Sequence, residues 1–255
     1  RARQAADRVG ATMMDRPEWV AANPRKPGEV YLTLTNNNRR VSEGGSANLP
    51  DGSTVAGSAR PAVDDANPRA NNVWGHILRW NEGGGDAAAL AFTWDLFVLA
   101  GQPGIAGARA PSANVNAGNV FNSPDGLAFD RHGRMWIQTD GNYSNTGDFA
   151  GMGNNQMLVA DPTTGEIRRF LVGPSGCEIT GVTFTPDRRT IFVNVQHPGE
   201  TPSDRSDPQA PARFSNWPDY HSDEPGGAKK GRTLFPMPFD GKRMIFGGFK
   251  PFLGL

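Results

Sequence analysis

The chain has 255 residues, and its 26 Lys and Arg residues are balanced by 26 Asp and Glu residues. This balance gives no overall attraction to nucleic acid or to anionic membrane surfaces. The longest apolar run, around Leu96–Ala100, is too short to span a bilayer. Glycine (32 residues) and proline (21 residues) are abundant without a Gly-X-Y period, which favours a turn-rich, all-β protein.

Strands are predicted where β-branched and aromatic residues lie between Gly, Pro, Asn and Asp. The pattern predicts helix only over residues 1–9 and, for a turn or two, over residues 17–22. Asp161–Gly165 predicts a hairpin turn. Residues 42–70 and 101–118 are loop-like, and the first stretch is equally compatible with an ordered functional loop and with disorder. In chain order, the predicted strands are 29–35, 76–80, 91–99, 134–139, 156–160, 167–171 and 190–195.

One short pattern occurs three times with an acid in the same place. Glu18, Asp125 and Glu178 each precede an apolar run, a polar turn and a second apolar run. The separations, from 18 to 125 and from 125 to 178, are close to two units and one unit of about 53 residues. A further unit is therefore predicted near residue 71, where Asn72 takes the place of the acid.

Periods of this kind with several short strands per unit are typical of a β-propeller. Residues 1–200 are therefore predicted to form a partial β-propeller of about four blades, each of about 53 residues. Residues 201–255, rich in Pro, Asp and Gly, are predicted to form an irregular or divergent tail. Four blades are fewer than most closed propellers contain, so we expect further blades to lie in sequence outside this chain.

The three acids define the candidate site, because the first strand of each blade begins near the axis of a propeller. Carboxylate oxygens that converge there suit Ca²⁺, Mg²⁺, Mn²⁺ or a trivalent iron centre. Arg16, close to Glu18, suits the binding of a phosphoryl oxygen. From the residues alone, each acid is also compatible with capping a turn, and Arg16 with a surface ion pair to Asp15 or Glu18.

Weaker candidates have residue types more typical of turns or of a polar core. Cys177 is more typical of a small buried hydrophobe than of a ligand for a soft metal. No Walker A loop, G-x-S-x-G elbow or H-E-x-x-H motif occurs in the sequence, so nucleophilic serine chemistry has no local support. The weaker candidates are Asn37, Asn72, His76, Asp140 and His197.

Several stretches of the chain resemble the PhoX-type alkaline phosphatases, and they occur in the same order as in that family. The resemblance covers about residues 10–220. The matching stretches are Met14–Glu18, Val30–Asn37, Gly75–Trp80, Phe121–Leu127, Trp136–Gly141, Gly176–Gly181, Phe192–Gly199 and Ser215–Asp219.

The resemblance implies a β-propeller with a mixed iron–calcium cluster at its central mouth. It also implies hydrolysis of small phosphate monoesters in the periplasm or outside the cell, after Tat export. Glu18 and Arg16 resemble a cluster ligand and a phosphate-contacting arginine, and Asp125 and Glu178 resemble further ligands. Family members are longer, and further ligands, including a cysteine, come from sequence before the part that this chain resembles. The tail after Asp219 also departs from the family pattern, so the activity of this chain alone stays open.

Two other functions are compatible with the sequence. The stretch Ser123–Asp130, followed by Gly133–Ile137, also resembles calcium-dependent lactonase or esterase propellers, and a propeller can be a non-catalytic scaffold that binds a partner. If the protein is a phosphatase, it is expected to bind iron with calcium and to release phosphate. If it is a lactonase, it is expected to bind calcium alone. A scaffold predicts no tightly bound transition metal. Arg16 beside Glu18 favours the phosphatase, and the oligomeric state is left open.

Overall fold

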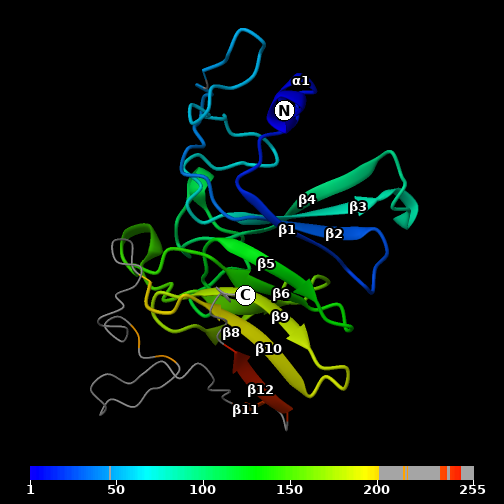
Figure 1. Cartoon of the computed structure of the whole chain (residues 1–255), viewed down its shortest axis with the longest axis vertical. Coiled ribbons are helices and arrows are strands. Elements are labelled where there is room, and N and C mark those ends of the chain that lie inside the picture. Colours follow the sequence, from blue (N-terminus) through cyan, green and yellow to red (C-terminus); the bar gives the residue numbers. More distant parts are fainter. Residues whose placement is uncertain (46, 201–214, 216, 218–235, 240–241, 248–255) are drawn as a thin grey trace, which may run out of the picture.

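The computed structural model describes residues 1–45, 47–200, 215, 217, 236–239 and 242–247 (Figure 1). The regular secondary structure of the described part consists mainly of strands, which confirms the all-β class. Its one α-helix, α1, spans Ala2–Arg8, within the predicted range. Three short 3-10 turns span Gly83–Gly85, Gly107–Arg109 and Gly147–Phe149. Within the described residues, no helix is both long and apolar enough to cross a membrane.

The strands form three four-stranded sheets, which follow one another along the long axis of the molecule (Figure 1). The first has the order β1-β2-β3-β4, with β1 Pro17–Ala22, β2 Glu29–Leu34, β3 His76–Glu82 and β4 Phe92–Leu99. The second has the order β5-β6-β7-β8, with β5 Pro124–Phe129, β6 Met135–Thr139, β7 Gln156–Ala160 and β8 Ile167–Val172. The third has the order β11-β12-β10-β9, with β9 Glu178–Phe184, β10 Thr190–Gln196, β11 Pro236–Phe239 and β12 Lys242–Gly247.

Each predicted strand corresponds to an observed one, and the predicted hairpin turn joins β7 to β8. Gly165 closes this turn by donating its N–H to the carbonyl of Asp161 at 2.8 Å. The helical turns predicted over residues 17–22 are wrong, because this segment is strand β1 and pairs antiparallel with β2. The two alanines favour a helix only weakly, and the hydrogen bonds offered by β2 outweigh that preference.

The separate unit predicted near residue 71 is also wrong. Strands β3 and β4 continue the first sheet, because β3 pairs antiparallel with β2 over its whole length. The irregular segment between β2 and β3 is long. Its length makes the spacing of the pattern in the sequence resemble that of an additional repeat unit. The described residues therefore form three sheets, and β1, β5 and β9, which contain the three acids, begin them. The predicted tail 201–255 lies mostly outside the described residues, but β11 and β12 within it are strands.

Two hydrophobic clusters hold the sheets together. The side chains of β6 alternate between them, as strand geometry requires. Met135 and Ile137 belong to the cluster that also contains Tyr31 of the first sheet, whereas Trp136 belongs to the cluster that contains Val193 of the third. The second sheet is thus covered on both faces, and its ends are fixed relative to the neighbouring sheets.

A buried polar network attaches the segment between β2 and β3 to the start of β1. The guanidinium of Arg40 donates from Nε to Oδ1 of Asp15 at 2.7 Å, and both side chains are fully buried. Asn72 donates from Nδ2 to the other oxygen of the same carboxylate at 2.9 Å. Because Asp15 directly precedes Arg16, this network fixes the backbone that leads into the candidate site.

Replacing Arg40 by Met should destabilise the protein by about 3–5 kcal/mol, because it leaves the buried carboxylate of Asp15 without its cation. The free energy of unfolding from urea titration measures the effect. Arg39→Met is the matched control, since Arg39 is exposed and should change stability by less than about 0.5 kcal/mol. Equal effects of the two variants would contradict this role of the ion pair.

Candidate functional site

Strands β1 and β5 start in the same way. Arg16 and Ser123 each precede a proline and have a positive φ, of 55° and 52°. The carbonyl of each accepts a backbone N–H from just beyond the end of the neighbouring strand, at 3.0 Å and 3.1 Å. Both strands then contain a register shift beside the acid, Glu18 or Asp125. The repeated X-Pro-acid pattern is therefore a repeated backbone geometry that presents the acids at one end of the sheets.

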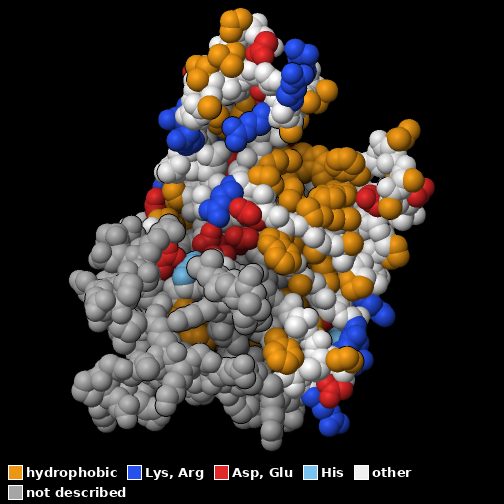
Figure 2. All heavy atoms as spheres, in the orientation of Figure 1, with side chains coloured by type: hydrophobic (Ala, Val, Ile, Leu, Met, Phe, Trp, Pro, Cys, Tyr) orange, Lys and Arg blue, Asp and Glu red, His pale blue; other side chains and the backbone are white. Residues whose placement is uncertain are grey.

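Three carboxylates from the second and third sheets lie together at this end. One oxygen each from Asp125, Asp140 and Glu178 lies within 4.8 Å of the others. Asp125 lies near the start of β5, Asp140 directly follows β6, and Glu178 begins β9. Figure 2 shows a group of acidic side chains near the middle of this face, with a basic side chain and a histidine beside it. The predicted convergence thus holds for Asp125 and Glu178, and Asp140 joins them.

Arg16 links the first sheet to this carboxylate group. Its Nε donates to Oε1 of Glu18 at 2.8 Å, and its Nη2 donates to Oδ2 of Asp140 at 2.6 Å. Partial burial lowers the pKa of Arg16, but the hydrogen bonds to Asp140 and Glu18 outweigh it and raise the pKa overall. Among the described residues, no hydrogen-bond partner is found for Nη1, and nearly half of the side chain is exposed. Glu18 therefore adjoins the group through Arg16.

The third sheet completes the site with a chain of polar contacts. Gln196 donates from Nε2 to Oε2 of Glu178 at 2.7 Å, and Nε2 of His197 lies 3.5 Å from the same oxygen. The other ring nitrogen of His197, Nδ1, lies 2.6 Å from Oε2 of Glu200. His197 is thus held between two carboxylates, those of Glu178 and Glu200.

The negative charge of the carboxylate group is larger than the positive charge of the side chains around it. Burial raises the pKa of Asp125 to about 6, and the charges of Glu18 and Asp140 add to this effect. Burial raises the pKa of Glu178 to about 7, supported by Asp140 and Asp125 and opposed by His197. A bound cation would offset this charge and restore the ionised carboxylates.

In the presence of a chelator, the thermal midpoint of the protein should fall as the pH rises from about 4 to about 7. The pKa values of Asp125 and Glu178 are higher in the folded protein than their ordinary values of 3.8 and 4.5. Protonation therefore favours the folded state, and this contribution is complete below about pH 4 and lost as the pH passes about 6 to 7. Each group contributes on the order of 3 kcal/mol. Melting curves of Asp125→Asn should show a smaller pH dependence, and an unchanged one would contradict this origin.

The first sheet also fixes the backbone that carries Asp125. Thr33 donates from Oγ1 to the carbonyl of Asp125 at 2.7 Å, and Thr35 donates to the carbonyl of Pro124 at 3.0 Å. Both threonines are buried. The position of the Asp125 carboxylate in the second sheet thus depends directly on the first sheet, through strand β2 and the residue that follows it.

The remaining predicted residues lie outside the carboxylate group: Asn72 and His76 are in the buried network, and Asn37 adjoins it. Asn37 and Asn72 form an isolated bridge between their backbones. Asn72 also donates to Nδ1 of His76 at 3.1 Å, and burial lowers the pKa of His76 to about 4. Sequence reasoning missed Gln196 and Glu200, which contact Glu178 and His197. Their only signal was proximity to His197 at the end of a predicted strand.

The donor set of the carboxylate group fits a hard cation. All three ligands that it offers are carboxylate oxygens, which suit Ca²⁺ or trivalent iron. Cys177, which directly precedes Glu178, is not part of the group, because it is almost fully buried in the second hydrophobic cluster. Burial raises its pKa to about 12, which keeps it a thiol and confirms the prediction of a small buried hydrophobe.

The chain matches one protein family and is similar to a solved structure. A family model described as alkaline phosphatase PhoX matches residues 1–199. Among solved structures, the chain is similar to Pseudomonas fluorescens PhoX in complex with vanadate, a transition state analogue, with 49% sequence identity and a TM-score of 0.71. That match covers 86% of this chain and 33% of the Pseudomonas protein, so the chain spans about a third of its relative's length. No match was found among the curated proteins. The chain belongs to the alkaline phosphatase PhoX family.

Proposed function

We propose that this chain supplies part of the active site of a metal-dependent phosphatase that hydrolyses small phosphate monoesters. The observation that carries the proposal is the convergence of Asp125, Asp140 and Glu178 beside the guanidinium of Arg16. The similarity to a PhoX protein in complex with vanadate, a transition state analogue, supports it. Phosphoryl transfer needs cationic groups around the phosphoryl centre in its transition state.

Arg16 would bind the substrate. Its Nε and Nη2 are held by Glu18 and Asp140, so the orientation of the planar guanidinium is fixed before a substrate arrives. A phosphoryl oxygen would then accept a hydrogen bond from Nη1, for which no partner is found among the described residues. Charge-assisted bonds from a fixed guanidinium are strong and directional, and they stabilise the charge that develops on the phosphoryl oxygens.

The carboxylates would hold the metal. We propose calcium and iron as the bound metals, with Asp125, Asp140 and Glu178 as ligands and Glu18 beside them. When bound, the cation would supply positive charge near the phosphoryl oxygens and would make a water molecule more nucleophilic. Gln196 and His197 would orient the carboxylate of Glu178 through the contacts described above, as partners of metal ligands commonly do.

We also propose that the three sheets are blades of a β-propeller that is incomplete within this chain, and that the protein acts in the periplasm or outside the cell after Tat export. The sequence of three four-stranded sheets, each with an acid in its first strand, supports the propeller. The location follows from the family resemblance alone.

Elemental analysis of the purified protein, together with phosphate release from 4-nitrophenyl phosphate, tests the function. Iron with calcium and the release of phosphate are expected. Calcium alone without phosphate release would favour a lactonase instead. The variant Glu18→Gln should lose activity, because it frees the guanidinium of Arg16 from one of its two carboxylates. Full metal content and full activity in that variant would contradict the role given to Glu18.

A further inference from the structure

The second and third sheets border a cavity. It lies at the end of these sheets that is opposite the carboxylate group. Its volume is about 680 Å³, which lies in the range of pockets that bind small molecules. It is lined by the end of β5, the start of β6 and the turn between β9 and β10. Asp125, Asp140 and Glu178 lie at the other ends of these strands, so the cavity is separate from the candidate metal site.

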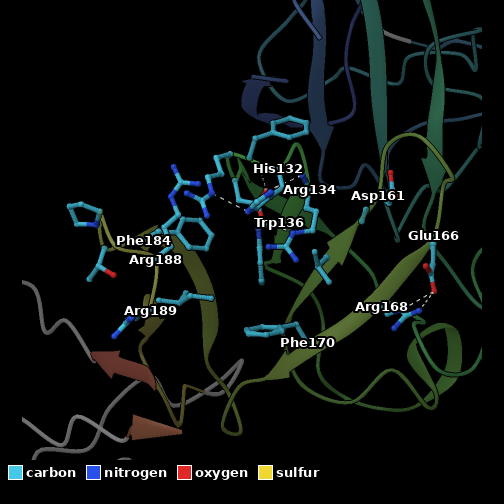
Figure 3. Close-up of a pocket in the computed structure, with 18 residues that line it drawn as sticks. His132, Arg134, Trp136, Asp161, Glu166, Arg168, Phe170, Phe184, Arg188 and Arg189 are labelled. Carbon is cyan, nitrogen blue, oxygen red and sulfur yellow. Dashed lines mark hydrogen bonds and ion pairs between the residues drawn. The ribbon is translucent and has the colours of Figure 1, made fainter. Parts of the chain in front are cut away.

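The cavity contains an aromatic cluster. The ring of Trp136 packs edge-on against Phe170, with 4.9 Å between ring centroids, and against Phe184, with 5.6 Å between centroids. Figure 3 shows Phe184, Arg188 and Arg189 on one side of the cavity and Asp161, Glu166 and Arg168 on the other. Such a cluster offers ring faces and edges to a flat, apolar ligand.

Positive charge is in excess around these rings. Two of the arginines in the lining are neutralised within the cavity, Arg134 by Asp130 at 2.6 Å and Arg168 by Glu166 at 2.6 Å. A third acid, Asp161, accepts the backbone N–H of Thr163 in the β7–β8 turn. The lining contains five arginines in all: Arg131, Arg134, Arg168, Arg188 and Arg189.

Arg188 is the group that points to a ligand. Its Nη1 is buried and has no hydrogen-bond partner within the part of the chain that the structure describes. A buried guanidinium nitrogen without a partner is costly, and an anion that bonded to it would remove that cost. The residue lies in the β9–β10 turn with a φ of 58°, and its backbone N–H donates to the carbonyl of Thr185 at 2.8 Å, so the turn holds it at the edge of the aromatic cluster.

We propose that this cavity binds a small aromatic anion, with its ring against Trp136, Phe170 and Phe184 and its charged group on Arg188. A carboxylate, a sulfonate or a phosphate on one or two fused rings has this chemistry. The proposal does not depend on the phosphatase function, because no residue of the carboxylate group lines the cavity.

Calorimetric titration with 2-naphthoate tests the proposal. Saturable binding is expected, with acetate, which lacks the ring, and 2-naphthalenemethanol, which lacks the charge, each binding at least tenfold more weakly. Binding should be the same with and without a chelator. Loss of binding on chelation would place the probe at the carboxylate group and overturn the proposal, as would the absence of binding.

Variants of Arg188 then locate the anion. Arg188→Gln should weaken the binding of 2-naphthoate at least tenfold, and Arg188→Lys, which keeps the charge, should weaken it less. Arg3→Gln, in the exposed helix α1, is the matched control and should bind as the unchanged protein does. Unchanged affinity in Arg188→Gln would overturn the proposal. A structure of the complex, which needs no variant, should show the carboxylate on Arg188, and a probe found elsewhere would also overturn it.

Discussion

Replacing Asp125 by Asn should weaken the binding of Ca²⁺ to the carboxylate group by about 100-fold or more. Loss of a residue that merely supports a metal ligand commonly costs 10–100-fold in affinity, so loss of a ligand should cost at least as much. Asn has nearly the same shape as Asp, and Thr33 bonds to the backbone carbonyl of this residue, so the fold should be kept. Burial remains the main cause of the raised pKa of Glu178, and the loss of charge removes only the smaller contribution of Asp125 to it.

Calorimetric titration with Ca²⁺ after removal of bound metal measures this effect. Asp65→Asn is the control, because Asp65 is exposed and lies in the segment between β2 and β3. The affinity of the Asp65→Asn variant for Ca²⁺ should be unchanged. If Asp125→Asn bound Ca²⁺ as tightly as the unchanged protein, the carboxylate group would not be a metal site.

Replacing Arg16 by Gln should lower kcat for 4-nitrophenyl phosphate by about 10²–10³-fold, the usual cost of removing one donor that stabilises transition-state charge. Arg16→Lys should recover little of this rate, because an ammonium cannot bond to Glu18, Asp140 and a phosphoryl oxygen in one plane. The metal content should stay nearly unchanged, since Arg16 is not a ligand.

The control for Arg16 is Arg79→Gln, which breaks an ion pair of similar kind with Asp95 in the first sheet. Its kcat should be unchanged. Vanadate inhibition gives a second readout, and Arg16→Gln should need at least tenfold more vanadate for the same inhibition. A variant that lost its metals together with its activity would show that Arg16 supports the fold of the site rather than the substrate.

The strands were predictable from the sequence because each is a short apolar run between turn residues, as in the segment 156–160 that became β7. The sheet to which a strand belongs was not predictable in the same way. The even spacing of Glu18, Asn72, Asp125 and Glu178 suggested four equal units. The structure shows instead that Arg40 bonds to Ala62 and Asp64 within the segment between β2 and β3, and that this segment returns the chain to the first sheet.

The candidate site was predictable where the backbone pattern repeats. Asp125 and Glu178 stood out because both begin a strand pattern, whereas Asp140 follows a strand and resembles an ordinary turn residue. Its place beside them depends on the pairing of β5 with β6 and on the packing of β6 against β9. Long-range contacts of this kind leave no local signal in a sequence, and the same holds for Glu200.

The bonds from Thr33 to Asp125 and from Arg16 to Asp140 join residues 92 and 124 positions apart in the chain. Contacts between such distant residues form only after long loops have closed, which makes them slow to form. A polypeptide growing from its N-terminus cannot assemble the three carboxylates before residue 178 has been synthesised. Capture of the metal is therefore expected to follow the docking of the sheets, so an unfinished chain would have no assembled centre with which to take up the metal.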